Sequence, residues 1–238
     1  MNRLRRVGHK GADLIAPGNT YASFDAALQA GVDMIEFDVL PERDSGRLIL
    51  AHDYRDAEGR QPHTLDEGLA HLASAPFAGI ELDVDLKLQG YELQVVEALR
   101  AHGVLDRCLI SSQYRSSLQL IRSSEPRVRL GWSVPKIRRD PFRSKRTAVP
   151  ALVGLVVLRW GLPIRAARAI KRGSCHALMA HWRLVTPRLV RSLRRAGGEL
   201  YVWTVDDPVR LRSLERMGVT GVITNDPRLF GDLESGRS

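Results

Sequence analysis

Two carboxylates set two residues apart in an apolar run place the strongest constraint on what this chain can fold into. Glu36 and Asp38 lie in segment 33–39, whose other central residues are apolar, as in a short buried strand. Because side chains alternate on a strand, both carboxylates point to one face. Two buried carboxylates repel each other unless a cation lies between them, and oxygen ligands suit a divalent metal. The segment predicts a metal site on a buried strand or, alternatively, a solvated pair on an edge strand.

Polar residues follow other apolar runs in the same way. His9 follows the short run 4–7, and His52 follows the run 48–51. In segment 80–87 the alternation is strict, with four charged residues on one face: Glu81, Asp83, Asp85 and Lys87. A surface strand could also alternate like this. Three strands that each present such groups at their carboxyl ends are, however, typical of a barrel active site.

Strand-like and helix-like runs alternate along the whole chain. The eight expected strands are 6–9, 34–39, 80–86, 108–112, 127–133, 176–180, 199–205 and 221–224. Eight repeats of strand and helix predict an α/β fold, a closed (β/α)8 TIM barrel formed by residues 1–238 as a single domain. The alternative is an open doubly wound sheet, but no glycine-rich nucleotide fingerprint follows the first strand.

Cysteine content and apolar segments bear on the compartment. The two cysteines, Cys108 and Cys175, have no metal or redox spacing, so we expect buried free thiols. No apolar signal core follows the basic start of the chain, and no run reaches the roughly 20 apolar residues of a spanning helix. These features predict a cytoplasmic protein.

The positive charge is concentrated in one block. Residues 121–172 contain fourteen Lys or Arg and two acids, a net charge of +12, whereas the whole chain has +9. Such a block attracts anionic surfaces such as phosphate-bearing substrates, acidic lipids or nucleic acid. A solvated, arginine-rich surface without a partner is the alternative. Because only three aromatic residues, Trp132, Phe142 and Trp160, lie in the block, fewer than base stacking would need, we expect no nucleic-acid partner.

A long insertion with this basic character follows the fifth expected strand. Within it, residues 136–172 predict a helical lid on the catalytic face, whose apolar centre, 149–158, dips toward lipid. This would give a peripheral membrane contact, at the inner membrane face for a cytoplasmic protein. The alternative is an ordinary barrel helix that packs its apolar side on the strands.

Seven short motifs in order resemble the glycerophosphodiester phosphodiesterase family. They are His9-Lys10-Gly11, Pro17-Gly18-Asn19-Thr20, Glu36-Phe37-Asp38, His52-Asp53, Asp85-Leu86-Lys87, Trp203-Thr204-Val205 and the ending Gly221 to Pro227. Each motif is weak alone. Together, at barrel spacing and over nearly the whole chain, they make a specific resemblance.

The resemblance implies a role for each matching residue. Glu36, Asp38 and Asp85 match the ligands of a divalent cation, usually Ca²⁺ or Mg²⁺, and His9 and His52 match the catalytic acid–base pair. The substrate-binding matches are Lys10 and Lys87 near the phosphate and Trp203 as an aromatic wall of the pocket. Two histidines with pKa values near neutrality suit this chemistry, because one deprotonates the nucleophile and the other protonates the leaving oxygen. The nucleophile, water or a neighbouring glycerol hydroxyl, is left open.

Three positions depart from the family pattern. Gly18 replaces a Glu and removes a charge near the site. Lys10 replaces an Arg and so loses a bidentate fork while keeping a point charge. Asp85 replaces a Glu and shortens the ligand by one methylene. We therefore expect a divergent branch with altered substrate choice, or a weak or inactive member.

The leading functional prediction is metal-dependent hydrolysis of glycerophosphodiesters to an alcohol and glycerol phosphate, in lipid metabolism. The alternatives are a lysophospholipase D-like enzyme that acts on lysophospholipids at a membrane surface, and a catalytically weak, phospholipid-binding barrel. His181, beside Trp182, either lines the pocket or has a structural role, and the sequence leaves this open. The remaining histidines are expected to be structural: His63, His71, His102 and His176.

Overall fold

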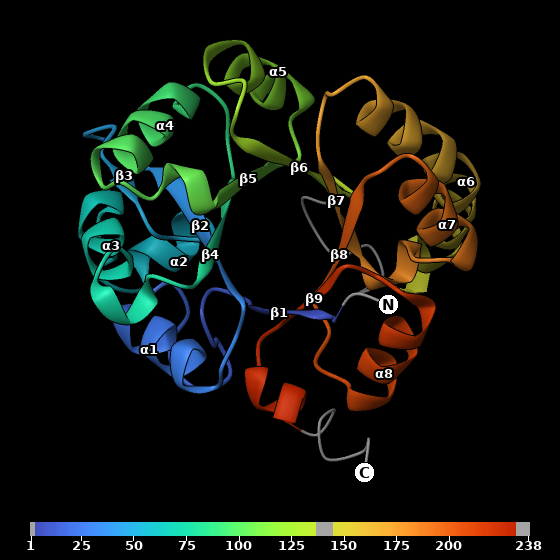
Figure 1. Cartoon of the computed structure of the whole chain (residues 1–238), viewed down its shortest axis with the longest axis horizontal. Helices are drawn as coiled ribbons and strands as arrows, with labels where there is room; N and C mark the ends of the chain where they lie inside the picture. Colours follow the sequence, from blue (N-terminus) through green and yellow to red (C-terminus); the bar gives the residue numbers. More distant parts are fainter. Residues whose placement is uncertain (1–2, 137–144, 232–238) are drawn as a thin grey trace.

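The computed structural model, which describes residues 3–136 and 145–231, is a closed barrel of eight parallel strands (Figure 1). The strands are β1 (Arg5–Gly8), β2 (Met34–Pro41), β4 (Glu81–Leu86), β5 (Cys108–Ser112), β6 (Arg129–Val134), β7 (Ala177–His181), β8 (Glu199–Trp203) and β9 (Gly221–Thr224). Because β1 pairs in parallel with both β2 and β9, the sheet has no open edge there. The predicted TIM barrel is confirmed, and the open doubly wound sheet was the wrong alternative.

Helices surround the barrel on its outer side (Figure 1). They are α1 (Tyr21–Gln29), α2 (Tyr54–Glu58), α3 (Leu65–Leu72), α4 (Glu92–Ala101), α5 (Arg115–Ser124), α6 (Lys145–Lys171), α7 (Pro187–Arg195) and α8 (Pro208–Met217). Local caps set several starts. Thr20 forms a capping box with Ser23, and the Asp207 carboxylate accepts the Arg210 N–H at 2.6 Å.

The excursion after β2 contains a small strand in the apolar run 48–51, in addition to the eight barrel strands. A two-residue strand, β3 (Leu48–Ile49), pairs antiparallel with the end of β2, and α2 follows it. This pairing continues β2 past the barrel rim. It brings the segment that ends at His52 to the carboxyl end of the strands, where barrel active sites form.

The core has two shells. Between strands and helices lie large buried side chains such as Phe24, Phe37 and Leu69. Inside the barrel a second apolar cluster includes Met34 and Tyr201. Close-packed shells on both sides of the strands hold the residues at the strand ends in fixed positions.

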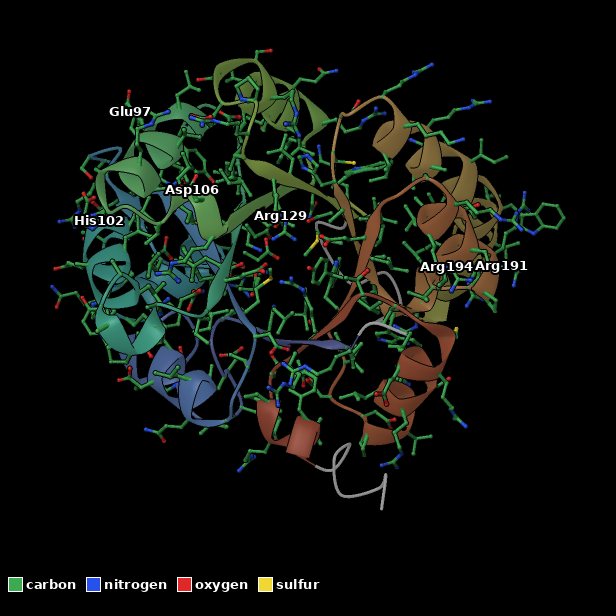
Figure 2. The ribbon with its side chains drawn as sticks, in the orientation of Figure 1. Glu97, His102, Asp106, Arg129, Arg191 and Arg194 are labelled. Atoms are coloured by element: carbon green, nitrogen blue, oxygen red, sulfur yellow. The ribbon has the colours of Figure 1, made fainter. Side chains whose placement is uncertain are left out.

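An ion-pair network closes the amino end of the barrel. Arg129 lies in the barrel interior (Figure 2) and donates at 2.7 Å to both Glu81 and Glu199. Arg5 also pairs with Glu81. Glu81 thus lies on the same face of β4 as Asp85, as predicted, but its ion pairs are at the amino end of the barrel, opposite the end where Asp85 lies.

Helix α6 is three times as long as its neighbour α7, with 27 residues against 9. Its carboxyl-terminal part packs on the barrel through the buried residues Leu162, Ala166 and Ala169. The predicted lid is thus wrong for this part, which is an ordinary barrel helix that contacts α7. Within the predicted 136–172 segment, residues 137–144 lie outside the described residues.

Several expectations about single residues are also met. Cys108 and Cys175 are buried free thiols. His71 contacts Asp25 at 2.8 Å, and His102 contacts Asp66 at 3.2 Å, so both have structural partners away from the strand ends. Across the described ranges, none of the helices combines the length and apolar character that a bilayer crossing requires.

Candidate active site at the carboxyl end of the barrel

Three carboxylates converge at the carboxyl end of neighbouring strands. Glu36 and Asp38 come from β2 and Asp85 from β4, and one oxygen of each lies within 4.8 Å of the others. Strand register explains this, because Asp38 is the direct partner of Asp85. Glu36 and Asp38 are buried, and the Asp85 side chain is 13% exposed. The solvated pair on an edge strand is therefore excluded.

The donor set fits a hard divalent cation. Oxygen ligands from carboxylates suit Ca²⁺ and Mg²⁺. Burial, and next the charge of Asp38, raise the pKa of Glu36 well above its usual range. The three carboxylates cannot all ionise unless positive charge is added between them. A bound divalent cation would supply that charge. The shorter Asp85 does not prevent the three side chains from converging.

Lys87 supplies the positive charge that is present among these carboxylates. Its ammonium lies 2.5 Å from Asp38 Oδ1 and also contacts Asp85 Oδ2. Burial alone would lower the pKa of Lys87, but Asp38 and Asp85 outweigh burial and raise it. Burial would likewise raise the pKa of Asp38, but Lys87 in particular holds it well below its usual range. Lys87 therefore stays cationic among these carboxylates.

Asn19 fixes the orientation of Asp38. The buried Asn19 amide donates to Asp38 Oδ2 at 3.0 Å and accepts the Asp38 backbone N–H at 3.0 Å. Asn19 adopts a left-handed backbone with φ of 60°, which asparagine tolerates better than most residues. The Pro-Gly-Asn-Thr motif thus holds a carboxylate ligand as well as starting α1.

His9 follows β1 and is held by a relay of hydrogen bonds. Its Nδ1 lies 2.5 Å from Asn225 Oδ1, while Asn225 Nδ2 donates to Asp206 at 2.7 Å. Because Asp206 accepts from the amide nitrogen, the amide oxygen faces His9, and Nδ1 carries the proton. The unprotonated Nε2 then faces the carboxylates, 3.9 Å from Glu36. Burial lowers the pKa of His9, although Asp38 opposes this shift.

His52 lies at the outer side of the same centre. Its side chain is 49% exposed, and its Nδ1 is 3.5 Å from Asp53 Oδ2. A charged His52 is close enough to Asp38 to help lower the pKa of that carboxyl. The two histidines thus flank the carboxylates, with His9 mostly buried and His52 open to solvent.

The loop after β1 explains two departures from the family pattern. Lys10 donates to Asp13 at 3.2 Å, and its backbone N–H donates to Glu36 at 2.9 Å. A Cβ added at Gly18 would lie 2.5 Å from Asp13 Oδ1 and 2.8 Å from the Lys10 Cβ. Asp13 therefore occupies the space that a side chain at position 18 would enter. The loop keeps an acid beside the site, but from another position.

An aromatic group stands beside the site on β7 and β8. His181 and Trp203 are direct partners across the two strands, with ring centroids 5.1 Å apart in an edge arrangement. Trp182 stacks on His181, and the Arg210 guanidinium lies 3.7 Å above the Trp182 ring. His181 therefore lies next to Trp203 at the carboxyl end of the barrel, which is the position expected of a residue in the pocket wall.

Sequence reasoning missed Asn225, Asp206 and Asp13. Asn225 was part of a quoted motif, yet its contact with His9 spans 216 positions and depends on barrel closure. Asp206 lies 19 positions before Asn225, and nothing in the local sequence connects the two. Nothing in the local pattern around Asp13 distinguishes it from an ordinary loop acid.

The chain matches a protein-family model, the glycerophosphoryl diester phosphodiesterase family, over residues 9–69 and 87–229. The matched ranges include seven of the eight residues to which the resemblance assigns a role. The eighth, Asp85, lies two positions before the second range.

Individual relatives resemble the chain over almost its full length. A glycerophosphodiester phosphodiesterase of Caldanaerobacter subterraneus is 24% identical, covering 95% of this chain and 96% of the relative. One from Bacillus subtilis is 24% identical and covers 99% and 88%. A solved Oleispira antarctica phosphodiesterase, in complex with the product sn-glycerol-3-phosphate, superposes with a TM-score of 0.73 at 22% identity, covering 98% and 97%. A Parabacteroides distasonis glycerophosphodiester phosphodiesterase gives 0.76 at 17%, covering 98% of each chain.

Proposed function

This chain belongs to the glycerophosphoryl diester phosphodiesterase family, and we propose that it hydrolyses glycerophosphodiesters to an alcohol and glycerol phosphate with the help of a divalent cation. The observation that carries the proposal is the convergence of Glu36, Asp38 and Asp85 within 4.8 Å, next to two histidines. The relatives' names and the sn-glycerol-3-phosphate product complex of one structural neighbour support the substrate class.

The three carboxylates would hold Ca²⁺ or Mg²⁺. When bound, such a cation stabilises the negative charge that develops on the phosphate oxygens in the transition state. Lys87 and Lys10 add positive charge on the same side, and both stay protonated because nearby carboxylates raise the pKa of each against burial. Preorganised charge of this kind is the largest contribution in many phosphoryl-transfer sites.

The two histidines divide the proton transfers. His9 has its proton fixed on Nδ1 and a pKa lowered by burial, so at neutral pH its Nε2 is free to accept the proton of the attacking hydroxyl. As the new bond to phosphorus forms, the bond from phosphorus to the leaving oxygen breaks. His52, open to solvent, donates a proton to that oxygen, and the alcohol departs.

Steady-state hydrolysis of glycerophosphocholine and glycerophosphoethanolamine tests the proposal. We expect release of choline or ethanolamine with glycerol phosphate, loss of activity in a chelator, and recovery with Ca²⁺ or Mg²⁺. Turnover that persists at full rate after exhaustive chelation would contradict the metal role. Absence of turnover on every glycerophosphodiester offered, with either metal, would leave the catalytically weak barrel.

A further inference from the structure

The amino-terminal half of α6 extends far beyond the barrel wall. The part of α6 that packs on the barrel, 161–171, is about as long as α4, α5 or α8, each of which has 10 residues. The preceding part, 145–160, is additional. At 1.5 Å per residue it adds about 24 Å of helix.

This extension lies on the same side of the barrel as the candidate site. Strand β6 ends at the carboxyl edge, and β7 begins at the amino edge only a few residues after Lys171. A helix that ends at the amino edge must begin toward the carboxyl edge. Contact between α6 and η4 (Trp182–Leu184), which follows the carboxyl end of β7, agrees with this direction.

The described end of the extension exposes large apolar side chains. Trp160 is 71% exposed and Val157 is 65% exposed, and Val156 and Ile164 are each close to half exposed. Exposed apolar side chains that gather on one element mark an interaction site more often than isolated ones do. An exposed tryptophan beside aliphatic residues is typical of the boundary between water and lipid.

The sequence around these side chains carries positive charge only. Residues 141–198 contain thirteen Lys or Arg and no acid, although the whole chain has a net charge of +9. Helix α7, which packs beside α6, exposes Arg188, Arg191, Arg194 and Arg195. Figure 2 shows Arg191 and Arg194 on this flank. The flank thus combines apolar anchors with a uniform positive field.

We propose that this α6–α7 flank binds an anionic phospholipid membrane, with the exposed apolar residues of α6 inserted among the lipids and the α7 arginines at the headgroups. A second copy of the chain fits less well, because it would bring two strongly basic flanks together. A nucleic acid would satisfy the arginines but leave Val156 and Val157 in water. Because the extension of α6 lies on the same side of the barrel as the site, membrane binding would bring the site close to lysophospholipids as substrates, and this last step rests on the proposed function.

Co-sedimentation of the full chain with vesicles tests the membrane contact. We expect binding to vesicles of equal parts phosphatidylglycerol and phosphatidylcholine, weaker binding as salt rises, and little binding to phosphatidylcholine alone. The double variant Val157→Ser/Trp160→Ser should bind about tenfold or more weakly, because most of the inserted apolar area is lost. The matched control, Leu93→Ser/Leu120→Ser, removes exposed leucines of α4 and α5 and should bind like the wild type.

The contribution of the α7 arginines to membrane binding is tested by two triple variants that remove the same formal charge. Arg188→Ser/Arg191→Ser/Arg195→Ser should weaken binding to anionic vesicles and flatten its salt dependence. Arg47→Ser/Arg100→Ser/Arg127→Ser removes the same formal charge from exposed positions outside α6 and α7 and should not. Equal loss in both triple variants would contradict a localised flank and leave only a general effect of net charge.

Other outcomes would overturn the proposal. These are no binding to anionic vesicles at low salt, self-association that Val157→Ser/Trp160→Ser abolishes, or tighter binding to a single-stranded oligonucleotide than to vesicles. Hydrolysis of soluble glycerophosphocholine, measured on each variant, keeps the two proposals apart. Membrane binding without any hydrolysis would refute the proposed function alone, and hydrolysis without membrane binding would refute this inference alone.

Discussion

His9 Nδ1 lies 2.5 Å from Asn225 Oδ1, so the residue after the first strand is oriented by the residue after the last. The same hydrogen bond raises the pKa of His9 and thus partly offsets burial, the larger influence. Asn225 itself is held by Asp206 through two hydrogen bonds of 2.8 and 2.7 Å. Asp206 and Asn225 therefore position His9.

Asn225→Ala should lower turnover by about tenfold, less than the 10² to 10⁴ expected for loss of the base itself. Because the lost hydrogen bond raises the pKa of His9, that pKa should fall further in the variant. The acid limb of the rate profile should then move to lower pH, since the base stays unprotonated longer. Rate profiles of the variant and of the control Asp226→Asn would decide, and an unshifted limb would show that Asn225 does not act through His9.

Glu36→Gln and Asp38→Asn should abolish metal-dependent hydrolysis and weaken metal binding in calorimetric titration with Ca²⁺ or Mg²⁺. Each variant removes a charged ligand from the group of three. The control is Glu81→Gln, at the opposite end of β4, which should cost stability through its arginine partners but leave metal affinity unchanged. Wild-type affinity in Asp38→Asn would show that the cation lies elsewhere.

His9→Ala and His52→Ala should each reduce the turnover number by about 10² to 10⁴. His102→Ala, on a surface helix end paired with Asp66, should not change it. Single-turnover kinetics separate chemistry from product release. A loss of less than tenfold for either residue, with unchanged KM, would remove that residue from the proton transfers.

Lys87→Met should destabilise the metal-free protein by about 3 kcal/mol, because it leaves the buried Asp38 carboxylate without its cationic partner. Added Ca²⁺ or Mg²⁺ should then raise the melting temperature more in this variant than in the wild type, since the metal restores the missing positive charge. Turnover should fall even at saturating metal. Lys171→Met, an exposed change of the same kind, is the control, and an equal metal response in both would refute the idea.

Gly18→Ala should destabilise the protein by about 1–3 kcal/mol, because the new methyl group overlaps Asp13 and Lys10. Gly79→Ala meets open space and should be nearly neutral. Urea unfolding measures both. Adding Asp13→Ala should recover part of the loss at position 18, and strict additivity of the two changes would contradict a shared space.

The barrel and the centre of its site were predictable because their signals are local. The side chains that share a face follow from the strict alternation over 80–87 and from the two-residue spacing of the acids at 36 and 38. Parallel pairing then brings the carboxyl ends of these strands together. The length of α6 was not predictable in this way, since an apolar segment within a basic block is compatible with packing or with exposure. The run 48–51 indicated a strand, but its antiparallel pairing with β2, as β3, was not predictable, because it depends on β2 continuing past the rim.

Contacts that form only when the barrel closes could not be predicted from local sequence patterns either. The partners of His9 depend on segments that meet only in the folded barrel, whereas the contact between Asp13 and Gly18 is local and depends on how the loop after β1 folds. The family resemblance identified the residue types but did not indicate that Lys10 would pair with Asp13.

Because β1 is held between β2 and β9, the chain cannot assemble a working centre before β9 has been synthesised. The ribosome releases the early strands with their carboxylates and His9 long before β9 and Asn225 emerge. Until then one side of β1 has no partner strand, and the base has no fixed tautomer. Activity should therefore appear only after β9 and Asn225 have been synthesised. For the same reason, a fragment that stops before β9 should regain activity when the missing strand is supplied as a separate peptide.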